Sequence, residues 1–260
     1  MILLTGASGF VGHKIAELPG VIACPSLRGK SEEDIRRIVE ESGADVIIHT
    51  AAMSDIGTCE AHPDESYYAN VQIPVYLAKA AGKRKLVCFS SDQVYSGMDE
   101  PGPYKEDEVK AANLYAREKI EMEERVLDIS PDAVMLRAEW MYDYYEARSN
   151  YFMLLLNSKG PLYFSSKDYR GVTYLKEVAS NILKTTLLPG GAYNYGSETD
   201  RSFYDITKDY LLKLGKDTEL IDSEPSHNLW MDCSKAASYD IFFSGVENGL
   251  MKCARDYGVI

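Results

Sequence analysis

The stretch Met1-Ile-Leu-Leu-Thr-Gly6-Ala-Ser-Gly9-Phe-Val-Gly12 opens the chain and indicates a strand, a glycine turn and a helix in succession. Gly6 permits a sharp turn, Gly9 leaves the backbone open to a phosphate, and Gly12 lets the helix lie close to the strand. This spacing alone also suits an ordinary tight turn. Its place between a strand and a helix favours a site for the pyrophosphate of a dinucleotide.

Apolar runs alternate with helical patterns through the first half of the chain. The runs predict further strands at 21–24, 45–49, 86–89 and 133–136. The patterns between them predict helices at 12–18, 31–43, 63–82 and 112–126, with Pro74 as a kink or break in the third. We therefore expect a Rossmann-type, doubly wound α/β fold, in which a parallel sheet has helices on both faces. Ligands of such sheets lie beyond the carboxyl ends of the strands.

The second half carries shorter elements, with no repeat and no obvious linker. The pattern predicts strands at 162–164 and 193–195, and helices at 151–158, 174–188, 202–214 and 244–257. Ser202 and Ser244 are the expected caps of the last two helices. We expect a nucleotide-binding domain over residues 1–142. Residues 143–260 should form mainly a small α/β cap that binds substrate, with some segments that return to the core sheet.

Composition limits the classes of partner. The formal net charge of −12 opposes binding to nucleic acid, which needs Lys and Arg to displace counterions. No apolar stretch is as long as a membrane span and no signal peptide precedes the first strand, so we expect no membrane partner. Five scattered cysteines suit a reducing cytoplasm. Neither the cysteines nor the four histidines have metal-ligand spacing, so we predict no metal site.

A tyrosine and a lysine, Tyr115 and Lys119, lie one turn apart on the predicted helix 112–126. A nearby ammonium stabilises a phenolate, so we expect the pKa of Tyr115 to fall from about 10 towards the working range. Such a phenol can protonate a ketone oxygen or take a proton from an alcohol. A solvated helix face would show the same spacing. Only Tyr115 follows a strand that ends in serines, which favours a catalytic pair. The same interval recurs at Tyr163/Lys167 and Tyr204/Lys208.

Polar and aromatic residues follow the strands predicted at 86–89 and 133–136. Ser91 either holds a substrate carbonyl through its hydroxyl or is an ordinary polar strand end. Asp92 is either a substrate contact or a turn cap. Trp140 either stacks on a ligand or simply buries area.

Together these motifs resemble the extended short-chain dehydrogenase/reductase family, and within it the dTDP-4-dehydrorhamnose reductase group. The matching stretches run in order over the first 142 residues: Thr5-Gly-Ala-Ser-Gly-Phe-Val-Gly12, Asp45-Val-Ile-Ile-His-Thr-Ala-Ala52, Cys59-Glu60, Ala69-Asn70-Val71, Phe89-Ser-Ser-Asp-Gln-Val-Tyr-Ser-Gly97, Pro103-Tyr104, Asn113-Leu-Tyr-Ala-Arg-Glu-Lys119 and Leu136-Arg-Ala-Glu-Trp-Met-Tyr142. A fainter similarity continues at Asn150-Tyr-Phe152, Lys167-Asp-Tyr-Arg-Gly171 and 193–202.

The resemblance implies a role for each candidate site residue. Ser91 would orient the substrate carbonyl, Tyr115 would donate the proton, and Lys119 would hold the nicotinamide ribose. Asp92, Trp140 and Asn150 would contact a nucleotide-sugar substrate. The residues implied to line the NAD(P) site are Gly6, Gly9, Phe10, Val11, Gly12, Thr50, Ala51, Ala52 and Ser90, together with Tyr115 and Lys119. The implied reaction is hydride transfer from NAD(P)H to a 4-keto-6-deoxy-sugar nucleotide.

The chain departs from the family pattern both where the cofactor's adenosine is expected and where the substrate is expected. The family often has an acidic residue after the second strand, where this chain has Ala23-Cys-Pro-Ser-Leu-Arg28. Arg28 and Lys30 favour the 2′-phosphate of NADP, whereas NAD remains open if Arg28 is only a surface residue. Near the substrate, Gly171-Val-Thr173 replaces the expected Gly-x-Pro-Thr, and 224–228 departs from the usual Arg-Pro.

Three functions follow as hypotheses. The first is an NAD(P)H-dependent reductase of a nucleotide-linked keto sugar. The second is a reductase of the same mechanism with another carbonyl substrate, which the net charge of −12 favours. The third is a dinucleotide-binding regulatory subunit without turnover, against which the complete set Ser91, Tyr115 and Lys119 argues. The sequence leaves open whether the chain forms a homodimer.

Overall fold

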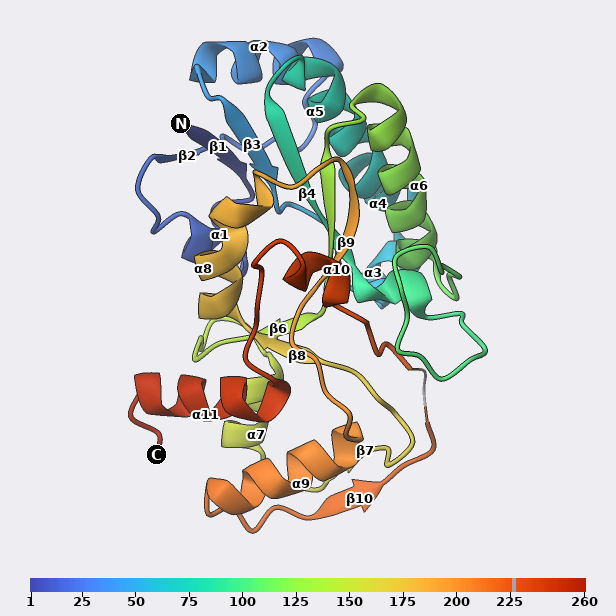
Figure 1. Cartoon of the computed structure of the whole chain (residues 1–260), viewed down its shortest axis with the longest axis vertical. Coiled ribbons are helices and arrows are strands. Elements are labelled where there is room, and N and C mark those ends of the chain that lie inside the picture. The colour runs from blue at the N-terminus through green and yellow to red at the C-terminus, as the bar shows by residue number, and fades with distance from the viewer. Residues whose placement is uncertain (226–227) are drawn as a thin grey trace.

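The computed structural model describes residues 1–225 and 228–260. Six parallel strands form the central sheet in the order β2-β1-β3-β4-β5-β9 (Figure 1). They are β1 (Ile2–Thr5), β2 (Val21–Ala23), β3 (Val46–His49), β4 (Lys85–Ser91), β5 (Val134–Ala138) and β9 (Gly191–Tyr195). The predicted doubly wound α/β class is confirmed. The strand order changes direction between β1 and β3, which is where such sheets bind ligands.

Helices cover both faces of this sheet because its strands bury side chains on both sides. Leu4, Ile48 and Val87 face α1 (Gly12–Ile15) and α8 (Leu175–Thr185). The preceding residue on each strand, such as Leu3 or Ile47, faces the opposite way. That second face packs against α2 (Glu32–Ser42), α5 (Ile73–Ala81) and α6 (Leu114–Ile129). Each of these buried aliphatic side chains contributes about 1.5–3 kcal/mol.

The segment predicted as one helix over 63–82 is divided into three. It contains α4 (Pro63–Tyr67), a π-helical turn η1 (Tyr68–Gln72) and α5. Pro74 lies in the first turn of α5, directly after the π-helical turn. The backbone stays helical through this point, so the predicted kink or break is a change of helix type and the chain is not interrupted. A further helix, α3 (Ile56–Ala61), precedes α4 and is absent from the sequence prediction. Its N-cap is Asp55, whose carboxylate accepts from Thr58 N at 2.8 Å.

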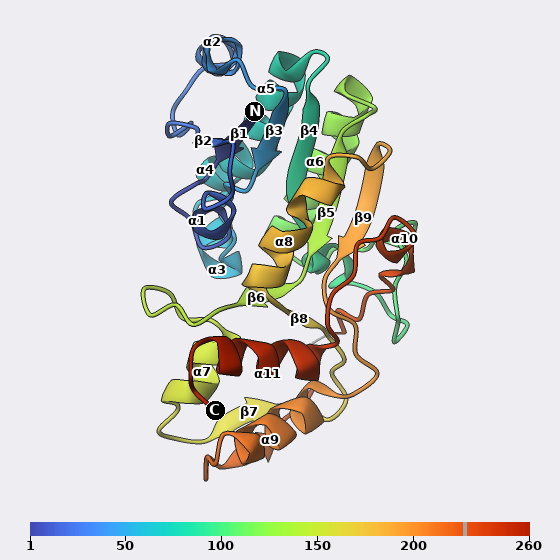
Figure 2. The same cartoon turned by 60° about the vertical axis from the view of Figure 1, so that its left-hand side comes forward.

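A second layer lies beyond the carboxyl ends of the sheet strands (Figure 2). Its strands pair as β6 (Trp140–Tyr142) with β8 (Val172–Tyr174) and β7 (Leu162–Phe164) with β10 (Leu220–Asp222). Its helices are α7 (Tyr151–Asn157), α9 (Phe203–Lys213) and α11 (Val246–Asp256). Their shared core is rich in aromatic side chains, among them Tyr142, Tyr151, Phe152, Tyr174 and Phe203.

Part of the second half packs on the sheet. After β8 the chain enters α8, which covers one sheet face, and then β9, which pairs with β5. The short helix α10 (Ser234–Ala237) also contacts the sheet, through Lys235 Nζ to Ala192 O at 2.7 Å. The sequence predicts the strand at 193–195 but does not predict its neighbour, because pairing between distant strands leaves no local pattern.

Of the helix caps predicted at Ser202 and Ser244, the structure confirms the first and contradicts the second. Ser202 caps α9, since its hydroxyl accepts from Asp205 N at 3.1 Å. The predicted cap at Ser244 is wrong, because α11 begins after Gly245 and has no side-chain cap. The Ser244 hydroxyl donates instead to Glu177 Oε1 at 2.6 Å and ties the start of α11 to α8.

Candidate active site

A cleft of about 1590 Å³ opens at the carboxyl ends of the sheet strands, between the sheet and the second layer. This exceeds the ~300–1,000 Å³ of a typical site for one small ligand, so there is room for two. All the residues predicted from the sequence as site residues line this one cleft: Gly6, Gly9, Phe10, Val11, Gly12, Arg28, Thr50, Ala51, Ala52, Ser90, Ser91, Asp92, Tyr115, Lys119, Trp140 and Asn150.

The turn requires glycine at Gly6 and Gly12 because a side chain at either position would clash with the protein backbone. Gly6 has φ +71°, a conformation that favours glycine. A Cβ on Gly12 would lie 2.0 Å from Gly6 O, and one on Gly6 would lie 2.8 Å from Ala51 N. The helix predicted to Leu18 is shorter than expected, because α1 ends at Ile15. The features available to a pyrophosphate are therefore the turn and its single helical turn.

Arg28 also lines the cleft. It is exposed and follows β2, as predicted. The Tyr68 hydroxyl fixes the loop by donating to Leu27 O at 3.2 Å and to Lys30 O at 2.5 Å. The cleft also contains the carboxyl groups of Asp64 and Glu65 from α4, which the sequence reasoning did not consider.

Tyr115 and Lys119 are both buried on α6, at 6% and 1% exposure. The Lys119 ammonium donates to Phe89 O at 2.9 Å and lies 5.7 Å from the centre of the Tyr115 ring. Burial lowers the pKa of Lys119 to about 8. Burial also raises the pKa of Tyr115 above its usual value of 10, and a hydrogen bond with Ser91 opposes this rise.

The predicted fall in the pKa of Tyr115 is therefore wrong in direction. Loss of water around the phenol outweighs any stabilisation of phenolate, and one of the three N–H donors of Lys119 is used by the Phe89 carbonyl. A phenol with a raised pKa holds its proton at neutral pH, which suits a proton donor. The matched interval at Tyr163/Lys167 is not on a helix, because Tyr163 lies in β7 and is 62% exposed.

Asp92 and Trp140 both line the cleft and both contact Arg170. Asp92 Oδ1 accepts from the Ser91 hydroxyl at 3.1 Å, and Asp92 Oδ2 pairs with Arg170 Nη2 at 3.0 Å. The Arg170 guanidinium carbon lies 5.6 Å from the centre of the Trp140 ring. The turn cap proposed for Asp92 is instead Ser91, whose hydroxyl accepts from Gln93 N at 3.2 Å.

Asn150 lines the cleft, but its amide is already hydrogen-bonded. Its Oδ1 accepts from Met153 N at 3.3 Å and caps α7, and its Nδ2 donates to Arg148 O at 3.1 Å. The Arg148 guanidinium lies over the Phe10 ring at 5.6 Å and reaches Ser54 Oγ at 3.5 Å. Asn150 thus caps α7 and binds the backbone of Arg148, which also lines the cleft.

Glu139 is a cleft residue that the sequence reasoning missed. It is 5% exposed, and its Oε2 accepts from Thr173 Oγ1 at 2.7 Å and from Ser197 N at 2.9 Å. Burial raises the pKa of this carboxyl to about 8. Gly171 and Gly196 make room for it, since a Cβ on either would lie within 2.3 Å of a Glu139 oxygen. The sequence did contain a sign of this residue, because Glu139 directly precedes Trp140 at the end of a predicted strand.

Two further buried carboxylates fix α6 in place. Glu118, next to Lys119, accepts from Ser66 Oγ at 2.6 Å and Asn70 Nδ2 at 2.8 Å. Glu123 pairs with the buried Arg137 of β5 at 2.7 Å.

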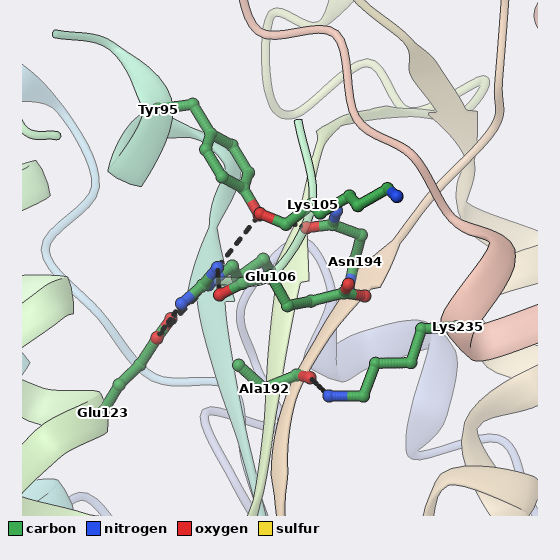
Figure 3. Close-up of polar contacts among 8 residues, drawn as sticks. Tyr95, Lys105, Glu106, Glu123, Ala192, Asn194 and Lys235 are labelled. Carbon is green, nitrogen blue, oxygen red and sulfur yellow. Dashed lines mark hydrogen bonds and ion pairs between the residues drawn. The ribbon is translucent and has the colours of Figure 1, made fainter. Parts of the chain in front are cut away.

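The Arg137 guanidinium also fastens the loop that follows β4. It donates to Tyr95 OH at 2.9 Å and to Glu106 O at 2.8 Å. Figure 3 shows Tyr95, Glu106, Glu123 and Asn194 converging on this network. Tyr95 OH in turn donates to Asn194 Oδ1 at 2.6 Å, so the loop is tied to β9.

Metal and membrane features are absent from the described parts of the chain. Within residues 1–225 and 228–260, no group of three or more His, Cys, Asp or Glu side chains could hold a metal ion. Burial lowers the pKa of His49 to about 3, and His49 Nδ1 lies 2.7 Å from Thr5 Oγ1. His227 and part of the 224–228 segment lie outside the described residues. None of the described helices is both long and apolar enough to span a bilayer.

Comparisons with known proteins agree with the predicted resemblance. Residues 1–235 match the family model described as the RmlD substrate binding domain. The chain is 34% identical over 151 residues to a dTDP-4-dehydrorhamnose reductase of Mycolicibacterium smegmatis, which covers 54% of this chain and only 46% of that protein. It is 31% identical over 235 residues to methionine adenosyltransferase 2 subunit beta of Xenopus tropicalis, which covers 79% of this chain and 69% of that protein.

Among solved structures, a dTDP-4-dehydrorhamnose reductase from Bacillus anthracis in complex with NADP has a TM-score of 0.85. The superposition covers 98% of this chain and 97% of that chain at 19% identity. At this identity the similarity establishes the shared fold.

Proposed function

The chain belongs to the RmlD substrate-binding domain family, and from that premise we propose that it is an NAD(P)H-dependent reductase of a 4-keto-6-deoxy nucleotide sugar. The observation that carries the proposal is the shared cleft. The glycine turn, Ser91, Tyr115 and Lys119 come from distant parts of the chain and all line it. The relatives named as dTDP-4-dehydrorhamnose reductases support the substrate class.

In the proposed reaction, bound NAD(P)H supplies a hydride to the carbonyl carbon. Tyr115 donates its phenolic proton to the carbonyl oxygen, so the ketone becomes an alcohol and the phenolate is reprotonated from solvent. Its raised pKa keeps the phenol protonated until charge develops on the oxygen. Ser91 orients the carbonyl through its hydroxyl. Lys119, a partly desolvated cation, stabilises the transient phenolate and binds the ribose.

The adenosine half of the cleft supports NADP as the cofactor. Arg28 lines the cleft and is exposed, which leaves its guanidinium accessible to a 2′-phosphate. No acidic residue lies between Val21 and Lys30 in the sequence. NAD is the alternative, and comparing the two cofactors directly decides between them.

The decisive experiment compares Tyr115→Phe with wild type. Nicotinamide absorbance reports turnover with a dTDP-linked 4-keto-6-deoxy sugar, and cofactor affinity is measured separately by titration. We expect kcat to fall roughly 10²–10⁴-fold, the usual contribution of a general acid, with cofactor Kd nearly unchanged. Tyr163→Phe is the matched control, because Tyr163 has the same interval to a lysine but is exposed outside the cleft. Full activity in Tyr115→Phe would remove Tyr115 from the role of proton donor.

A regulatory subunit without turnover is the second candidate. The observation in its favour is the 31% identity to a protein named as a subunit of methionine adenosyltransferase. This candidate predicts that wild-type protein binds NADPH or NADH yet reduces neither the keto-sugar nucleotide nor any other carbonyl compound offered. Sustained cofactor oxidation with any of these substrates would exclude it.

A cytoplasmic location fits the state of the cysteines. All five are unpaired, and all but Cys24 are buried. The excess of acidic residues supports small-molecule substrates over nucleic acid.

A further inference from the structure

Arg170 joins three elements at the substrate half of the cleft. It precedes β8 and lines the cleft, and its side chain is 17% exposed. Its guanidinium pairs with Asp92 at the end of β4 and lies over the Trp140 ring of β6. The same group lies 5.9 Å from the centre of the Phe203 ring at the start of α9. One side chain therefore links the core sheet to the second layer where the substrate is expected.

The contacts continue from Arg170 to the proposed proton donor. Asp92, 3% exposed, uses Oδ2 for Arg170 and Oδ1 for the Ser91 hydroxyl. Ser91 in turn is hydrogen-bonded to Tyr115. The guanidinium is thus connected to the phenol by three successive contacts, through Asp92 and Ser91.

We propose that Arg170 is a positioning residue for the proposed reductase function, and that it holds Asp92 and Trp140 in the arrangement that receives the substrate. The inference rests on that function for its kinetic test. It assigns Arg170 no contact with the reacting atoms. Arg170 acts through the two residues that it fixes.

The nearby charges explain why a cation is required at this position. Asp92 and the carboxyl of Glu139 interact with each other and with Arg170 within the same buried region. Without the guanidinium, Asp92 would be a buried carboxylate that has lost this cation. Lysine restores the charge, but it lacks the planar face that stacks on Trp140 and the fork that reaches Asp92 at the same time.

The first test is kinetic. Arg170→Gln should lower kcat/KM for the keto-sugar nucleotide by roughly 100-fold, the cost of a small misplacement in an active site, and leave the Kd of NADPH unchanged. Arg170→Lys should recover only part of the loss. The matched control is Arg201→Gln, because Arg201 also forms ion pairs, with Asp209 and Glu247, but lies outside the cleft. An Arg170→Gln enzyme with wild-type kcat and KM would overturn the proposal.

A double variant separates positioning from direct substrate binding. If Arg170 acts through Asp92, then adding Arg170→Gln to Asp92→Asn should cost little beyond Asp92→Asn alone. Effects that multiply would show that Arg170 has an independent role and would refute the positioning assignment.

A third measurement needs no turnover. Trp140 and Trp230 are the two tryptophans of the chain, so Trp230→Phe leaves the fluorescence of Trp140 alone. In that background Arg170→Gln should shift the Trp140 emission and increase its quenching by acrylamide, while Arg201→Gln should not. Unchanged fluorescence would overturn the inference even in an active enzyme. If wild type reduces no substrate but the fluorescence shift is found, the proposed function fails and the placement of Trp140 by Arg170 stands.

Discussion

Replacing the buried carboxyl of Glu139 by an amide should make the stability of the protein less dependent on pH. Glu139 is buried between Thr173 and Ser197 and has a pKa of about 8, compared with 4.5 when unperturbed. Between these two values the folded chain keeps a proton that the unfolded chain has released. Folding therefore becomes less favourable as the pH rises through this window. Glu139→Gln has no such proton and keeps an oxygen that can accept the two hydrogen bonds.

The size of the effect follows from the two pKa values. Between pH 5 and pH 7 the unfolded chain has already released most of its proton at this site, whereas the folded chain keeps almost all of its own. Each pH unit in this regime corresponds to about 1.4 kcal/mol, so the wild-type free energy of unfolding should fall by about 2.5 kcal/mol relative to that of Glu139→Gln. For a chain of this length this corresponds to about 5 °C in Tm.

The assay is urea denaturation of both proteins at pH 5, 6 and 7. At each pH the free energy of unfolding of Glu139→Gln is subtracted from that of wild type. The other titrating groups are common to both proteins, so a change of this difference with pH reports on Glu139. Glu124→Gln is the control, because it removes an exposed carboxyl from α6. A wild-type minus Glu139→Gln difference that is constant over this range would refute the argument that Glu139 is buried in its neutral form.

Three further predictions concern the cofactor and the proton donor. Gly12→Ala places a Cβ 2.0 Å from Gly6 O, so NADPH binding should weaken by at least about 100-fold or be lost, with circular dichroism to separate this from unfolding. Arg28→Ala should raise the Kd of NADPH about tenfold, equal to 1.4 kcal/mol, and leave that of NADH unchanged; equal effects on both would make Arg28 a surface residue. For Tyr115→Phe, pre-steady-state mixing should show slower cofactor oxidation after substrate binding, and an unchanged rate would place the proton elsewhere.

The sheet could be predicted from the sequence because its strands are buried on both faces. Runs such as the one at 45–49 contain several apolar residues in succession, and parallel strands of this kind are bounded by glycine turns and helices. The glycine turn was equally readable, since the conformation of Gly6 and the crowding around Gly12 exclude side chains. Helix α3 was missed because its short sequence, Ile56–Ala61, carries little apolar periodicity.

The predicted site residues line one cleft, but their pKa values could not be predicted from the intervals between them in the sequence. A Tyr–Lys interval says that two side chains share a helix face, but not that both are buried. In the structure burial determines both pKa values, and Lys119 is bound to Phe89, which is distant in the sequence. Glu139 was missed for a similar reason. Its partners, Thr173 and Ser197, lie 34 and 58 residues away.

The charge within the cleft differs from the charge of the chain. A net charge of −12 disfavours an anionic ligand if the whole surface acts together. Charges beyond about 8–10 Å are largely screened at physiological ionic strength, so the lining residues dominate. The basic residues among them are Arg28, Lys119, Arg148 and Arg170, and the acidic residues are Asp64, Glu65, Asp92 and Glu139.

Two of these four carboxyl groups contribute little negative field at neutral pH. Asp92 is paired with Arg170, and Glu139 holds its proton below a pH of about 8. Arg28 and Arg148 also line the cleft, Arg28 beyond β2 and Arg148 over the Phe10 ring. A dinucleotide and a nucleotide sugar both carry phosphate groups, and the cleft offers them local cations despite the acidic chain. The overall charge therefore does not favour an uncharged carbonyl substrate over a nucleotide-linked one.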